Sequence, residues 1–209
     1  MIVHTYHHII DPESAQTRCQ QALVDLWCKN WASYGWEPVV LNETNAAKHR
    51  FFNVINSSAW LQLSVNSWAY IRCCYNKYMA MENVGGGFFA DPDIINYGFT
   101  PDMLSYPPER LVFYQVGVPC VIHGQANDWK KIVQFFRNCA VLRRCGWKCT
   151  VEDISDMNLV QDFYETQITT IPVVEDYASA SSEAKLIHYH GGINGNRLEY
   201  IMKTRPPQF

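Results

Sequence analysis

The sequence has no cluster of lysine and arginine residues, and its formal net charge is only −3 over 209 residues. A protein that binds the backbone of a nucleic acid needs a basic patch that neutralises the phosphates. Because no such patch is present, no nucleic acid is expected among the partners of this chain.

Long hydrophobic runs are also missing. The uncharged stretch at residues 51–71 is interrupted throughout by asparagine, glutamine and serine, which argues against a membrane-spanning helix. The chain does not open with a basic segment, an apolar core and a small-residue cleavage site, which together mark a secretory signal. We therefore expect a protein without a transmembrane segment, located in the cytoplasm.

Cysteine is present, but without the spacing of common zinc sites. The eight cysteines include the neighbours Cys73 and Cys74 and the set Cys139, Cys145 and Cys149, which contains no CxxC pair. Reduced and partly buried thiols of a cytoplasmic protein are the expected interpretation.

What the sequence does contain suits one folded domain. Hydrophobic residues make up 48% of the chain and aromatic residues 14%, which is enough for a core. Residues 1–10 begin with a β-prone run, a helix is expected from residue 11 to Gly35, and residues 37–41 are typical of a second strand. This order is a βαβ unit, which favours parallel neighbours.

The alternation of helices and strands continues to the end of the chain. Helices are expected near residues 51–63 and 67–82 and from Asn127 and Ser155, and strands within 88–94, 110–124, 147–154 and 183–192. We predict an α/β fold with a single mixed, mostly parallel central sheet and helices on both faces. Ligands of such sheets bind outside the carboxyl ends of the strands, where the polar residues expected to emerge are Thr5, Tyr6, Asp91, Asp93, His188 and His190.

The stretch GGGFFADPDI, residues 85–94, ends an aromatic strand in two acids. Residues two apart on a strand point to the same side, so Asp91 and Asp93 are expected to project together into one crevice. Two carboxylates held so close repel one another unless a cation or a hydrogen-bonding ligand lies between them. Pro92 predicts that sheet pairing ends there.

Two motifs resemble those of a known family. The run KYMAMENVGGGFFADPD resembles the DXD region of GT-A-fold glycosyltransferases, with Lys77 and Tyr78 in the place of that family's basic-aromatic pair. LIHYHGG resembles the C-terminal HYxG element of a subset of these enzymes, with His188 on the histidine position. The resemblance spans roughly the whole chain and implies a single GT-A-like domain over residues 1–209. One departure is the family's lysine after this motif, for which Arg197 is the nearest cation.

The resemblance implies a metal site. Asp91, Asp93 and His188 would hold a divalent cation, with Asp93 on the metal itself and Asp91 nearer the ribose or a metal-bound water. Carboxylate oxygens combined with an imidazole favour Mn²⁺, with Mg²⁺ as the alternative. A nucleoside diphosphate is a poor leaving group unless its developing charge is neutralised, and a bound metal does this as a Lewis acid.

By the same resemblance, the donor would be a UDP-sugar that transfers a hexosyl or related group. Thr5 and Tyr6 end the first strand, where the family's base pocket lies, so Tyr6 would stack on uracil and Thr5 would hydrogen-bond to it. Alternatively, both residues simply end a strand. Lys77 and His190 are expected to contact the donor, and the acceptor would be a glycan or a protein-linked glycan.

An inverting reaction needs a base that takes the proton of the acceptor hydroxyl. Asp156, which begins a helix after a strand, is the first candidate, and Asp153 is the second. Helix N-capping by Asp156 is the alternative interpretation. A retaining mechanism would need no such base, and the sequence does not choose between the two.

Two other functions remain open at this point. A DxD at a strand end also opens haloacid-dehalogenase-like phosphatases, which would make the chain a metal-dependent phosphohydrolase, and a non-catalytic sugar or nucleotide module is the other alternative. The chain also resembles, more loosely, the N-terminal domain of multidomain glycosyltransferases of large DNA viruses of algae. That resemblance implies the host cytoplasm, with residues 203–209 as a linker to a further domain.

Overall fold

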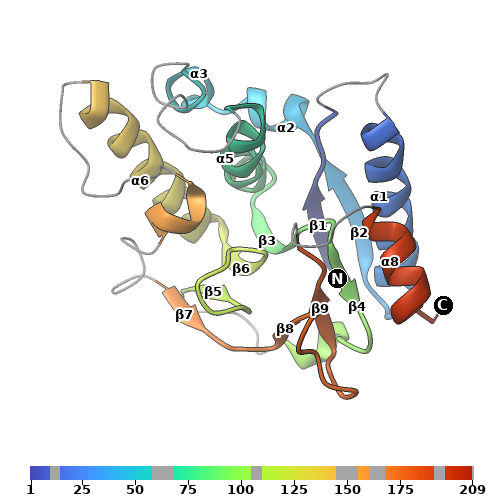
Figure 1. Ribbon diagram of the computed structural model, residues 1–209. Helices are drawn as coiled ribbons and strands as arrows, with labels where there is room; N and C mark the ends of the chain where they lie inside the picture. The colour runs from blue at the N-terminus through green and yellow to red at the C-terminus, as the bar shows by residue number, and fades with distance from the viewer. Residues whose placement is uncertain are drawn as a thin grey trace.

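The computed structural model describes residues 1–9, 15–57, 68–104, 110–144, 155–160, 168–190 and 196–208 (Figure 1). In chain order the elements are β1 (Ile2–Tyr6), α1 (Ala15–Ser33), β2 (Glu37–Leu41), α2 (Glu43–Ala47), α3 (Phe52–Ile55), α5 (Trp68–Asn83), β3 (Gly86–Ala90), β4 (Ile94–Asn96), the 3-10 helix η1 (Pro101–Met103), β5 (Leu111–Phe113), β6 (Val121–Gln125), α6 (Ala126–Arg144), β7 (Ile168–Thr170), β8 (Val174–Asp176), β9 (Leu186–His188) and α8 (Arg197–Thr204). A further helical segment covers residues 156–160.

Six strands form the central sheet, in the order β2-β1-β3-β6-β5-β7. Strand β1 pairs in parallel with β2 and β3, and β5 with β7, whereas β6 runs antiparallel to both β3 and β5. Helices α1 and α8 lie on one side of this sheet, and α2, α3, α5 and α6 on the other (Figure 1). The predicted βαβ unit and the mixed, mostly parallel sheet with helices on both faces are thus confirmed.

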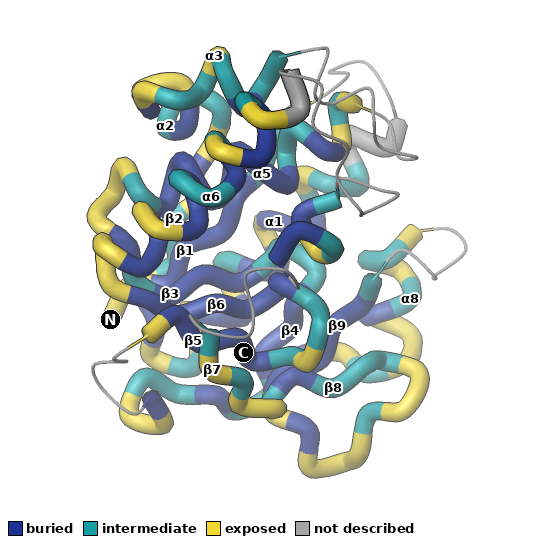
Figure 2. The backbone as a smooth tube through the Cα atoms, turned by 90° about the vertical axis from the view of Figure 1, so that its left-hand side faces the viewer, coloured by how far each residue is buried: buried dark blue, intermediate teal, exposed yellow. Residues whose placement is uncertain are grey.

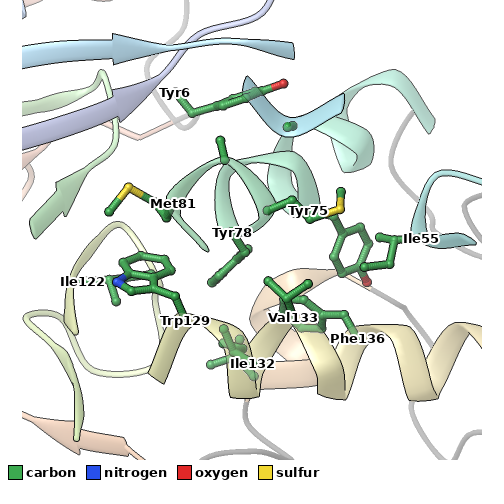
Figure 3. Packing of buried hydrophobic residues seen from close by; sticks show 14 of the residues in the cluster. Tyr6, Ile55, Tyr75, Tyr78, Met81, Ile122, Trp129, Ile132, Val133 and Phe136 are labelled. Atoms are coloured by element: carbon green, nitrogen blue, oxygen red, sulfur yellow. The ribbon is translucent and has the colours of Figure 1, made fainter. Parts of the chain in front are cut away.

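Each face of the sheet buries its own hydrophobic cluster, because neighbouring residues of a strand point to opposite faces. On β3, Phe88 packs in the cluster of Trp31 from α1, whereas Phe89 packs in the cluster under α5 and α6. In that second cluster Tyr78 of α5 lies beside Trp129 of α6 (Figure 3). Strands β1, β3 and β6 are accordingly buried along most of their length (Figure 2).

A second sheet of three strands, in the order β4-β9-β8, was not predicted. Strand β4 runs antiparallel to β9, with Ile94 opposite His188. The prediction that pairing ends at Pro92 is confirmed, since β3 ends at Ala90 and β4 belongs to the other sheet. The strand predicted near the end of the chain, β9, therefore joins the small sheet and not the central one.

Gly86 explains why glycines precede the two acids. Its φ is +83°, a conformation that L side chains rarely adopt, and a Cβ there would lie 2.7 Å from the backbone nitrogen of Ala126. Strand β3 approaches the start of α6 this closely only because residue 86 has no side chain.

Of the helix expected near residues 51–63, the structure shows only α3 at Phe52–Ile55, and residues 58–67 lie outside the described residues. The helix expected at 67–82 corresponds to α5, and α6 begins at Ala126, one residue before the expected Asn127. The start of the first helix at residues 11–14 and the strand at 147–154 lie outside the described residues. None of the helices in the described part of the chain is long and apolar enough to span a membrane.

The tail that was predicted to be a linker is tied to the small sheet at Arg205. Its guanidinium donates hydrogen bonds of 2.9, 3.0 and 3.3 Å to the carbonyl oxygens of Ser181, Ser182 and Ala184. The hydroxyl of Tyr97 donates to the carbonyl oxygen of Arg205 at 2.6 Å. The existence of a further domain stays a prediction.

The small sheet is fixed to α1 by two asparagines. The Asn30 amide nitrogen donates to the carbonyl oxygen of Asn96 at 2.8 Å, and the Asn96 backbone N–H donates to Asn30 Oδ1 at 2.7 Å. Both residues are fully buried, so water cannot replace these bonds. Trp31 adds a third bond between α1 and β4, from its indole N–H to the carbonyl oxygen of Ile94 at 3.2 Å.

We expect Asn30→Ala to lower the free energy of unfolding by about 3 kcal/mol, because it leaves two buried backbone groups of Asn96 without partners. Urea unfolding followed by circular dichroism measures this. Lys29→Ala, at an exposed position of the same helix, is the control and should change stability by less than about 0.5 kcal/mol. Equal effects of the two substitutions would contradict the role given to Asn30.

Candidate functional site

A cleft of about 440 Å³ opens where β1 and β3 end, between α1, α5 and α8. Six of the residues predicted for the site line it: Tyr6, Lys77, Asp91, Asp93, His188 and His190. Asp156, the predicted base, lines it as well. The carboxyl ends of the strands thus bring together residues from both ends and the middle of the chain.

Asp93 and His188 lie next to one another because their strands pair. The Tyr189 backbone N–H donates to the carbonyl oxygen of Asp93 at 2.9 Å, directly beside the Ile94–His188 pair of β4 and β9. As a result His188 Nε2 lies 3.7 Å from Asp93 Oδ1, with both side chains mostly buried. The two motifs that are far apart in the sequence therefore meet at one point of the cleft.

The other nitrogen of His188 is held by a side chain that orients the ring. His188 Nδ1 lies 2.9 Å from Gln115 Oε1, which also accepts a hydrogen bond from the Cys120 thiol at 2.8 Å. Burial lowers the pKa of His188, and the Asp93 carboxylate raises it only in part. A neutral ring that donates from Nδ1 to Gln115 presents the lone pair of Nε2 to Asp93.

Asp91 is paired with a buried lysine. Lys77 Nζ lies 3.3 Å from Asp91 Oδ2 and 3.5 Å from Asp156 Oδ2, and it donates to the carbonyl oxygen of Pro119 at 2.9 Å. Burial lowers the pKa of Lys77, but the two carboxylates outweigh that effect and raise it well above its ordinary value. Burial raises the pKa of Asp91 to about 7 even though Lys77 lowers it, because Asp93 and Asp156 add to the increase.

Asp91 and Asp93 reach the cleft from a turn and not from a strand, so the predicted strand geometry is wrong for them. Strand β3 ends at Ala90, and Asp91 and Asp93 belong to the turn that follows, closed by a hydrogen bond from Ile94 N–H to the Asp91 carbonyl oxygen at 3.0 Å. The alternation of side chains along a strand therefore does not apply to them. Asp91 turns toward α5, and Asp93 turns toward β9 and α8.

Arg197 and His190 complete the charged wall of the cleft. Arg197, the first residue of α8, places a guanidinium nitrogen 3.4 Å from Asp93 Oδ2. His190 Nε2 lies 2.6 Å from Asp176 Oδ2, at the end of β8. A cation near the place of the family's missing lysine therefore does point into the cleft.

The two residues at the end of β1 differ. Tyr6 lines the cleft, whereas the side chain of Thr5 is fully buried and is not among the lining residues. Thr5 Oγ1 has no hydrogen-bond partner among the described residues. The stacking by Tyr6 stays a prediction, since Tyr6 is only 6% exposed and packs in the core, and Thr5 is not placed to bind a ligand in the cleft.

Asp156 does not cap the helical segment that it begins. The cap is Ser155, whose hydroxyl oxygen accepts from the Asn158 backbone N–H at 3.3 Å. Asp156 is buried and accepts a hydrogen bond of 3.3 Å from the Tyr78 hydroxyl in addition to its pair with Lys77. Asp153, the second candidate, lies outside the described residues.

Of the three predicted metal ligands, only Asp93 and His188 lie together, because Asp91 is paired with Lys77. The spacing of that pair fits a divalent cation. Two ligands about 2.1 Å from one ion lie roughly 3.0 to 4.2 Å apart, and the observed 3.7 Å falls in this range. Among the described residues no group of three histidine, cysteine or acidic side chains could hold a metal ion. The pair instead resembles sites that bind an ion through few side chains together with substrate phosphates.

Some residues of the cleft were not expected from the sequence. Tyr70 and Met157 line it, and Gln115 and Asp176 orient the two histidines. Tyr70 lies seven residues before Lys77 on α5, a spacing that returns to the same helical face, so this signal was available. Gln115 and Asp176 carried no such signal, because their partners come from other elements.

Comparison with known proteins gives likenesses to solved structures alone. No protein-family model and no curated protein matches the sequence. Among the solved structures that match is a glycosyltransferase involved in the glycosylation of the major capsid of PBCV-1, with 13% sequence identity and a TM-score of 0.49 over 97% of this chain and 99% of that chain. A likeness at this level carries no functional inference.

We expect Lys77→Gln to lower the free energy of unfolding by roughly 3 kcal/mol at pH 8, because it leaves Asp91 and Asp156 without their shared cation. An acid whose pKa is higher in the folded protein than in the unfolded chain costs stability above its unfolded pKa. The loss should therefore be smaller at pH 5 than at pH 8, as measured by urea unfolding.

The control for this prediction is Lys131→Gln, which removes an exposed pair with Asp128. That substitution should change stability by less than about 1 kcal/mol at either pH. A loss for Lys77→Gln that does not change with pH would contradict the proposed charge network.

Proposed function

We propose that this chain is a metal-dependent glycosyltransferase that moves a sugar from a UDP-sugar donor to a glycan or protein-linked glycan. The observation that carries the proposal is the meeting of Asp93 and His188, 3.7 Å apart, in a cleft at the carboxyl ends of the strands. Each belongs to a separate motif of the GT-A glycosyltransferases, and their contact in space supports the resemblance seen in the sequence. It favours transfer over phosphate-ester hydrolysis, because His188 belongs to the motif that resembles glycosyltransferases.

In this proposal the donor diphosphate binds at the Asp93 end of the cleft. Asp93 and His188 hold Mn²⁺ or Mg²⁺, which supplies charge neutralisation for the leaving diphosphate when bound. Arg197 lies beside Asp93 and would contribute a second positive charge to the phosphate oxygens. Asp91, held by Lys77, would accept hydrogen bonds from the ribose or from a metal-bound water.

The nucleobase is assigned to the part of the cleft near the end of β1. Tyr6 lines the cleft there, and His7 and the apolar side chains of Leu23 and Val24 from α1 line it as well. An aromatic ring beside apolar side chains offers a stacking surface for uracil. His190 would contact the donor from the diphosphate end, where Asp176 holds its ring.

For an inverting reaction, Asp156 is the proposed base. The acceptor oxygen would form a bond to the anomeric carbon, the bond from that carbon to the phosphate oxygen would break, and the acceptor proton would pass to the Asp156 carboxylate. Asp156 lines the cleft, and its contacts with Tyr78 and Lys77 fix its position. Asp153 stays the second candidate, and a retaining reaction would use neither.

We expect UDP to bind in the presence of Mn²⁺ and to lose affinity on the order of a hundredfold with chelator, because the ion bridges the protein and the diphosphate. Isothermal titration calorimetry measures this for the wild type, for Asp93→Ala and for His188→Ala, both of which should lose the metal-dependent part. Asp102→Ala, at an exposed acid away from the cleft, should bind as the wild type does.

UDP affinity that is the same with Mn²⁺ and with chelator would refute the metal-dependent proposal. Release of UDP from UDP-sugars separates a transferase from a non-catalytic module that merely binds the nucleotide. Titrations of GDP and CDP in the same way test whether uracil is the preferred nucleobase.

We expect Arg197→Gln to lower the rate of UDP release about tenfold to a hundredfold, because one charge that stabilises the leaving diphosphate is lost. Arg197→Lys should recover part of the rate, since it restores the charge without the planar guanidinium. Lys203→Gln, at an exposed position of the same helix, serves as the control. A rate for Arg197→Gln within twofold of the control would remove Arg197 from the mechanism.

A further inference from the structure

One wall of the cleft carries exposed apolar side chains. Tyr70 is 55% exposed and Met157 is 41% exposed, although both line the cleft. At the diphosphate end, Asp93 (16%) and His188 (10%) are less accessible, whereas the side chains of Arg197 (36%) and His190 (40%) are partly exposed. Tyr70 and Met157 thus give the cleft an apolar surface that is open to solvent.

Tyr70 reaches this wall from the same helical face as the charged network. Tyr70, Cys74 and Lys77 follow one another at helical spacing on α5, and all three line the cleft. The pKa of the Tyr70 hydroxyl is raised, through Cys74 first, then burial and Asp156. Tyr70 is thus an exposed aromatic side chain on the helical face that also carries Cys74 and Lys77 into the cleft.

Met157 lines the same cleft from another element, the helical segment at residues 156–160. It directly follows Asp156, whose carboxylate is buried against Lys77. The apolar wall is therefore adjacent to the carboxylate proposed as the base. A ligand that rests on Tyr70 and Met157 would have one edge near Asp156 and the other in solvent.

We propose that Tyr70 and Met157 form the acceptor subsite and bind the apolar face of a pyranoside ring. This inference rests on the proposed function. A pyranose carries C–H groups on one face and hydroxyls around its edge, which matches an aromatic ring with a polar rim. An acceptor that is part of a larger glycan needs an open subsite, and the exposed side chains of Tyr70 and Met157 provide one.

Trp68 provides a matched control for this proposal. It is as exposed as Tyr70, at 55%, and lies two residues earlier in α5, but it is not among the residues that line the cleft. Its ring lies under the guanidinium of Arg72, 5.4 Å from the ring centre. An effect of Tyr70 that Trp68 does not share would arise from the cleft and not from a general loss of exposed aromatic surface.

The test measures binding of methyl pyranosides by saturation-transfer NMR, in a panel of both anomers of glucose, galactose, mannose, xylose and fucose. We expect at least one glycoside to bind the wild type, with Tyr70→Ala weakening it about tenfold and Tyr70→Phe keeping most of the affinity. Trp68→Ala should bind within twofold of the wild type. Binding should persist with saturating Mn²⁺ and UDP, because the acceptor and the nucleotide occupy different parts of the cleft.

Three results would overturn the inference. These are no binding of any glycoside by the wild type, equal losses in Tyr70→Ala and Trp68→Ala, and displacement of the glycoside by UDP with Mn²⁺. Because the experiment needs no transfer reaction, it stays informative if UDP binding fails. Failure of UDP to bind would refute the proposed function, whereas a Tyr70-dependent glycoside site would still stand as a carbohydrate-binding site.

Discussion

The pairing of β4 with β9 is the constraint on which the candidate site depends. Strand β4 begins directly after Asp93, and β9 ends in His188, so the register that places Ile94 opposite His188 also determines how far apart the two side chains lie. A shift of one residue in this register would turn the imidazole to the other face of the small sheet. The position of β4 is set in turn from α1, through the buried Asn30 and Trp31 side chains.

Charge compensation in the cleft is a property of the tertiary structure. Asp91 and Asp156 share the ammonium group of Lys77, and Asp93 is paired with Arg197. These cations lie on α5 and α8, and the acids lie on a turn and at the start of another helical segment. Buried acids are tolerated only when such partners are present, so the acids and cations of the cleft depend on one another for their placement.

The fold could be predicted from the sequence where local patterns are strong. Strand β2 was expected at residues 37–41 and is found there, because a short β-prone run follows the glycine that ends the first helix. The small sheet could not be predicted although β9 was expected as a strand, since β8 has only three residues, which is too short for a periodic pattern. Their pairing is decided by contacts with β4 from elsewhere in the chain.

The residues of the candidate site could be predicted only where they belong to a recognisable sequence motif. Asp93 and His188 were expected to meet, and they do lie side by side. The pairing of Asp91 with Lys77 was not expected, because the side-chain direction of a turn residue is not encoded by alternation. Thr5 and Tyr6 are neighbours on a strand, so only one of the two side chains can face the cleft. The sequence alone did not show that it is Tyr6.

The bonds of Arg205 have a bearing on where the polypeptide can be shortened. Its guanidinium binds three carbonyl groups of the loop that leads into β9, although the residue itself comes after α8. Removal of the last few residues would therefore break the hydrogen bonds that hold the loop before β9, the strand that ends in His188. Every residue that lines the cleft would still be present. A truncated protein could keep its central sheet and still lose the alignment of its histidine.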